Sequence, residues 1–175
     1  MSIKGENITK ALKFMRTFYV EIAQLLMKLD DLMEREGWMS ARGNRTTSLL
    51  SKDLKNPEKW LPDACFRLYE NKQLPSVRKG IVIDYATEGN KEPVLIIGSI
   101  TYRNIKDELD WDLWNLWFED EKHKVLNKDY FETDPETNNI RKGAIKNASL
   151  YTINLVEIAN EEDIKNKIYI KLMQL

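Results

Sequence analysis

The N-terminal stretch of the chain carries apolar side chains at alternating steps of four and three residues. These steps average about 3.5 residues, which places the side chains along one side of a single α-helix. The row consists of Ile8, Leu12, Met15, Tyr19, Ile22, Leu26, Leu29 and Met33. A second row, Ala11, Phe18, Leu25 and Leu32, runs beside it and widens the apolar face. The pattern therefore predicts one long amphipathic helix over residues 7–36.

Residues at both ends of this stretch favour a helix boundary. Asn7 is suited to the N-cap because its side-chain oxygen can accept a hydrogen bond from a backbone N–H of the first turn. Gly37 is suited to the C′ position, where a left-handed backbone ends many helices. Trp38 then follows and is expected to pack back against Met33, as in a Schellman motif.

The predicted helix is too long to be covered by a small sheet. At 1.5 Å per residue it spans roughly 45 Å, whereas typical strands are about 20 Å long. Its apolar face is also wider than the stripe of a free coiled coil. Part of the helix is therefore expected to contact other helices of the chain or a second copy of it. The predicted self-association face consists of Met15, Phe18, Ile22, Leu25 and Leu29.

Composition indicates a single globular domain over 1–175. The chain has 175 residues, of which 42% are hydrophobic and 31% charged, and a formal net charge of −1. This charge removes the simplest argument for nucleic-acid binding, a basic domain. No apolar run approaches the roughly 20 residues of a membrane span, and the polar N-terminus is unlike a signal peptide. With Cys65 as its single cysteine, the chain is predicted to be cytoplasmic and outside the membrane.

Strands are predicted in the middle and towards the end of the chain. A β-hairpin over 79–102 joins two stretches rich in β-branched residues through a turn-rich connection. Its second strand is apolar on both faces and is expected to be central in its sheet. Another strand is predicted over 149–158, and residues 62–70 fit a helix or a strand equally well.

Further helices are predicted around these strands. One covers the tryptophan-rich segment 107–120, another covers 161–173, and a short helix begins near Pro57. Residues 39–56 are interpreted as a surface loop. The predicted fold class is α+β, with a long N-terminal helix packed against a small, mostly antiparallel sheet and additional short helices.

Two clusters of side chains are candidate binding features. The loop over 40–48 is rich in arginine and hydroxyl groups, which can hold a phosphate or carboxylate. The candidate anion or nucleic-acid contacts are Arg42, Arg45, Arg78 and Arg103. The second cluster is aromatic, and it is interpreted as core, as a partner surface or as a small-molecule pocket. It consists of Trp111, Trp114, Trp117 and Phe118.

Signals of catalysis are weak throughout the sequence. His123 is the single histidine and has no Cys/His cluster beside it, so neither a transition-metal site nor a catalytic triad is predicted. No glycine-rich phosphate-binding motif is present, and no cofactor is expected. We therefore expect an interaction or assembly protein that is a homodimer or binds a protein partner. The alternatives are a nucleic-acid or phosphate-ligand binder, and a sensor or enzyme with a pocket at the tryptophan helix.

Overall fold

One antiparallel sheet organises the computed structural model, which describes residues 5–49, 55, 61–85, 92–119, 131–133 and 143–175. Within these residues the strand order is β1–β3–β4–β5–β7–β6, and β2 also pairs with β3. Every pair is antiparallel. The strands are β1 (Met39–Ser40), β2 (Thr47–Leu49), β3 (Ala64–Glu70), β4 (Val77–Asp84), β5 (Val94–Tyr102), β6 (Phe131–Thr133) and β7 (Ile145–Asn154).

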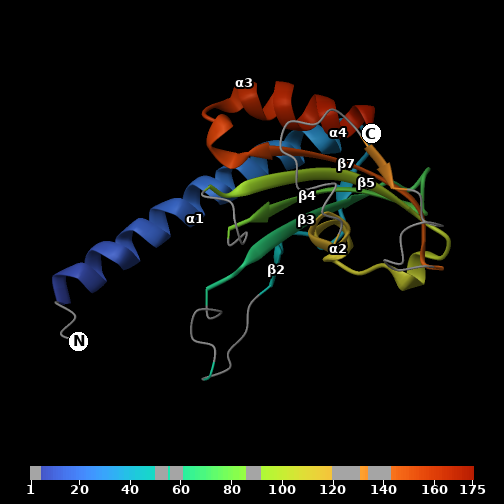
Figure 1. The fold of residues 1–175 in the computed structure, drawn as a ribbon. Helices are drawn as coiled ribbons and strands as arrows, with labels where there is room; N and C mark the ends of the chain where they lie inside the picture. Colours follow the sequence, from blue (N-terminus) through green and yellow to red (C-terminus); the bar gives the residue numbers. More distant parts are fainter. Residues whose placement is uncertain (1–4, 50–54, 56–60, 86–91, 120–130, 134–142) are drawn as a thin grey trace.

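The helices lie on both faces of the sheet (Figure 1), and the predicted α+β class, a long N-terminal helix against a mostly antiparallel sheet with short helices, is confirmed. The long N-terminal helix is α1 (Gly5–Glu34), and α2 (Asp112–Glu119) lies on the opposite face. Short 3-10 turns are η2 (Ile105–Asp107) and η4 (Leu155–Glu157). The C-terminal helix begins as α3 (Glu161–Asp163), continues through the π-helical turn η5 (Ile164–Tyr169) and ends as α4 (Ile170–Gln174).

Alternation along the strands creates a separate core on each face of the sheet. Ile81 and Ile83 of β4 pack with α1 and the C-terminal helix, whereas Val82 packs on the α2 side. Strand β5 lies between β4 and β7, and its residues Val94 to Ile97 are fully buried. The central position predicted for this strand is confirmed, because both of its faces are covered.

Two glycines make room for α2 on the sheet. Gly80 of β4 and Gly98 of β5 are direct cross-strand partners, and Leu113 of α2 packs over both. A Cβ atom added at Gly98 would lie 2.4 Å from Leu113 Cδ2, and one added at Gly80 would lie 3.1 Å from Leu113 Cδ1. The missing side chains therefore let α2 approach the sheet closely.

The C-terminal end of α1 has the predicted Schellman geometry. Gly37 has a φ of 77°, and its N–H donates to the Glu34 carbonyl. The N–H of Trp38 donates to the Met33 carbonyl at 3.0 Å, and both side chains are buried in the same core. The N-terminal boundary differs, because α1 already includes Gly5 and Asn7 lies within its first turn.

Several other predicted boundaries also change. The ambiguous segment 62–70 contains strand β3, since its side chains pack alternately into both cores. The loop predicted over 39–56 includes β1 and β2, which pair with β3. In the segment 107–120, α2 begins only at Asp112. Strand β7 covers 145–154 instead of 149–158, and η4 follows it. The start predicted at Pro57 lies outside the described residues.

Candidate interaction surface

The C-terminal half of α1 is part of the core of the chain. Ile22, Leu25 and Leu29 have at most 8% of their surface exposed and pack with the sheet and the C-terminal helix. These three residues belong to the predicted self-association face, but burial within the chain leaves them little surface for a partner. The other two, Met15 and Phe18, are half-buried. The accessible part of the predicted face is therefore nearer the N-terminus.

A polar network fixes this buried half of α1 to the sheet. Arg67 of β3 is 6% exposed, and its guanidinium forms a two-point ion pair with Asp30 of α1. Nη1 of Arg67 also donates to the carbonyls of Gly43 and Arg45 at 2.7 and 2.8 Å. The hydroxyl of Tyr69 donates to Asp30 Oδ1 at 2.8 Å. The network joins α1, β3 and the loop before β2.

The N-terminal half of α1 extends beyond the end of the sheet (Figure 1). We call residues 5–19 the projecting half. Several of its apolar side chains are exposed: Ile8 is 47%, Leu12 is 55% and Phe14 is 69% exposed. An isolated helix of this length would be only marginally stable in water. The projecting half therefore depends on the adjoining buried half of α1 for its helical structure. The fold thus presents an apolar helix surface in solvent.

An aromatic cluster lies where α1 leaves the sheet. The rings of Phe18 and Tyr85 are 5.5 Å apart in an edge-to-face arrangement, and those of Tyr19 and Tyr85 are 6.3 Å apart. Tyr85 follows β4, and its hydroxyl is 3.1 Å from Sγ of Cys65. Burial raises the pKa of both Tyr85 and Cys65, which keeps these groups protonated at neutral pH. The cluster anchors the base of the projecting half to the sheet.

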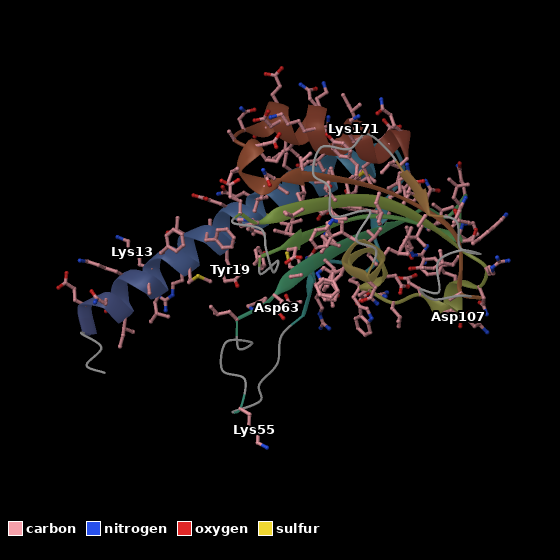
Figure 2. The ribbon with its side chains drawn as sticks, viewed as in Figure 1. Lys13, Tyr19, Lys55, Asp63, Asp107 and Lys171 are labelled. Carbon is pink, nitrogen blue, oxygen red and sulfur yellow. The ribbon has the colours of Figure 1, made fainter. Side chains whose placement is uncertain are left out.

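A notch separates the projecting half from the end of the sheet. It has a volume of about 390 Å³. Tyr19 of α1 and Asp63, just before β3, both line it, and Figure 2 shows Lys13 farther out along α1. Leu61, just before β3, is 57% exposed at its rim. The lining residues are Phe14, Met15, Phe18, Tyr19, Leu61, Pro62, Asp63, Tyr85 and Pro93.

The projecting half carries a positive charge. Lys10, Lys13 and Arg16 outnumber the single carboxylate, Glu6, so the sum is +2 within residues 5–19. Glu6 forms an ion pair with Lys10 one turn away. Asp63 lines the notch beside this half. A basic helix is therefore adjacent to an acidic group at the end of the sheet.

The four candidate anion-contacting arginines do not form one open patch. Glu108, which is 8% exposed at its side chain, lies between Arg42 Nη2 at 3.0 Å and Arg78 Nε at 2.7 Å. Arg42 also pairs with Asp110. This hydrogen bond raises the pKa of Arg42. An external anion would therefore have to compete with carboxylates of the chain for these two residues.

The remaining two arginines have different settings. Arg45 accepts a hydrogen bond from Arg67 through its carbonyl, and its own side chain is exposed. Arg103, which follows β5, donates its backbone N–H to the Ala144 carbonyl at 2.8 Å. The binding of nucleic acid or phosphate by this set of residues remains a prediction.

The tryptophan-rich helix divides between core and surface. Trp117 is fully buried with Leu113 and Leu116. Trp111 and Phe118 are 41% and 39% exposed, and the ring of Phe118 stacks on Trp114 at 4.7 Å. The aromatic stripe therefore contributes to the core mainly through Trp117, and its other members lie at or near the surface.

The part of the chain that the structure describes has no cluster suited to a metal ion. It contains no group of three or more His, Cys, Asp or Glu side chains placed to hold a metal ion. Cys65 is buried, and His123 lies outside the described residues. Among the helices of the described ranges, none is long and apolar enough to cross a bilayer.

Sequence reasoning missed two contributors to the projecting surface. Phe14 lies on the helix surface outside the two heptad rows, and Leu61 follows a turn-rich segment with no periodicity. The pattern did include Ile8 and Leu12, but gave no reason to separate them from the buried Ile22 and Leu29. The position at which the sheet ends marks that separation, and no local pattern encodes it.

Comparison of the chain with protein-family models, with curated proteins and with solved structures found no match. The geometry described above is therefore the basis for inferring its function.

Proposed function

We propose that the protein is a non-catalytic interaction and assembly protein that self-associates through the projecting half of α1. The observation that carries this proposal is the exposure of Ile8, Leu12 and Phe14 on a helix that extends beyond its own sheet. Contiguous exposed apolar surface on a soluble domain commonly marks an interaction site. A second copy supplies the same surface and can cover it symmetrically.

The energetic reason for association is the burial of these side chains. Covering an exposed Ile or Leu side chain contributes about 1.5–3 kcal/mol. Ile8 and Leu12 are only about half exposed, so covering each of them contributes about half of that value. In a symmetric dimer each residue counts twice, so the two together contribute roughly 3–6 kcal/mol before the entropy of association is subtracted. The same residues contribute little to the fold of one copy, because they are exposed in it.

The test is a charge substitution on the apolar side of the projecting half. Sedimentation equilibrium over a wide range of protein concentrations compares the wild type with Ile8→Glu/Leu12→Glu. We expect a dimeric wild type and a variant whose dissociation constant is raised at least about a hundredfold, from the burial energy above. Circular dichroism of both proteins establishes that the fold is retained.

A matched control distinguishes the loss of apolar side chains from the addition of two negative charges. Thr9→Glu/Thr17→Glu adds the same two carboxylates to exposed positions on the polar side of the same helix segment. This variant is expected to remain dimeric. A wild type that stays monomeric at every concentration would overturn the proposal, as would equal weakening by the two double variants.

A further inference from the structure

We infer that two copies pair with their α1 helices antiparallel, so that the N-terminal end of each projecting half enters the notch of the other copy. This inference rests on the proposed self-association. It names the occupant of the notch as a second copy of this chain. It also specifies which residues of the two copies meet.

The heptad pattern indicates on which side of α1 a partner must lie. Ile22 and Leu29 face the sheet of their own chain, and Ile8, Leu12 and Met15 continue the same side of the same straight element. An element that covers the projecting half must therefore lie on the sheet side of α1, next to the end of the sheet. The notch occupies that position.

Steric exclusion decides the relative direction of the two helices. In a parallel pair, the buried halves of both helices would face each other, but the sheet of each chain already occupies that space. In an antiparallel pair, only the projecting halves overlap, and the two sheets lie at opposite ends. The arrangement also closes on itself with a two-fold axis, so the projecting halves recruit no further copies.

The lengths of the elements match this arrangement. Ile8 precedes Tyr19 by eleven positions, which is about 16 Å along the helix. When two projecting halves overlap antiparallel over that distance, Ile8 of one copy lies near the base of the other helix. Leu61, exposed at the rim of the notch, is then available to contact it.

Charge is consistent with the same occupant. The projecting half has a sum of +2, from three cations and one carboxylate, and the notch contains Asp63. A basic apolar helix is therefore better suited to the notch than an acidic one. The contribution of this pair is expected to be modest, because charges near the surface are screened by water and salt.

Disulfide trapping tests the arrangement in the full chain. The variant Ile8→Cys/Leu61→Cys is made in a Cys65→Ser background, so that only the introduced thiols can react. A disulfide requires Cα atoms within about 7 Å of each other. Mild oxidation should therefore give a covalent dimer on a non-reducing gel, and reduction should reverse it.

The control moves one thiol to the opposite side of the helix. Lys13→Cys/Leu61→Cys, in the same background, places an exposed thiol on the polar side of the projecting half. We expect the covalent dimer to form at least tenfold faster with Ile8→Cys than with Lys13→Cys. Equal rates, or no covalent dimer with Ile8→Cys, would overturn the antiparallel pairing.

Sedimentation of the same variants without oxidant distinguishes a failure of the antiparallel pairing from a failure of self-association itself. A non-covalent dimer that fails to cross-link between positions 8 and 61 removes the antiparallel pairing and leaves self-association in place. A monomer at every concentration removes both.

Discussion

Removal of the Asp30 carboxylate tests whether the network with Arg67 fixes α1 to the sheet. In Asp30→Ala, the Arg67 guanidinium loses its two hydrogen bonds to Asp30 and keeps those to the Gly43 and Arg45 carbonyls, and Tyr69 loses the acceptor of its hydroxyl. Breaking a buried ion pair typically costs about 3–5 kcal/mol. The side chain of Asp30 is 20% exposed, so water can replace part of the interaction. We therefore expect a loss of about 2–4 kcal/mol.

Urea unfolding at neutral pH, followed by circular dichroism, measures this loss. For a chain of this size, it corresponds to a fall in melting temperature of roughly 5–15 °C. Asp31→Ala is the matched control, because it removes the same charge from the adjacent, exposed position of α1. That variant should change the free energy of unfolding by less than about 0.5 kcal/mol.

Equal effects of Asp30→Ala and Asp31→Ala would mean that the network contributes only through general charge, and the assignment of Arg67 as the anchor of α1 would be wrong. An additional Arg67→Met substitution should recover part of the loss in Asp30→Ala, because it removes the buried cation that lacks its partner.

Three further substitutions probe the core, the aromatic cluster and the C-terminal helix. Gly98→Ala should lower the free energy of unfolding by about 1–3 kcal/mol, because its Cβ would collide with Leu113; urea unfolding measures the loss. Burial raises the pKa of Cys65 above its ordinary value of 9.0, so the folded state retains a proton that the unfolded chain releases. Wild-type stability should therefore fall as pH rises above about 9, and the fall should be smaller in Cys65→Ser when both are followed by denaturant unfolding. Lys79→Met removes the donor that lies 2.6 Å from the Leu172 carbonyl, and should cost about 1–3 kcal/mol in thermal unfolding.

Much of the local structure is predictable because it depends on neighbouring residues. The end of α1 follows from Gly37, whose left-handed backbone lets Trp38 fold back on Met33. Alternation along β4 likewise assigns Ile81 and Val82 to opposite faces. The segment containing β3 is not assignable in the same way, because its side chains are apolar on both faces and a short run of that kind fits either element.

The candidate sites depend on residues that are far apart in the sequence. Arg42 and Arg78 suggest an anion patch in the sequence, but the fold places Glu108 between them. Trp117 is fully buried whereas Trp111 is 41% exposed, although both belong to the same aromatic stripe. No local pattern contains these outcomes, because each depends on which distant segment packs beside the residue.

Helix α1 shows what the local sequence determines and what tertiary packing determines. The sequence by itself determined that α1 forms, which side of it is apolar and where it ends, since these features arise from periodicity and capping within the helix. Only the tertiary structure decided that Leu29 is core while Leu12 is exposed. The physical reason is the length of the sheet: it covers one half of α1, and the same apolar pattern continues past its end into solvent.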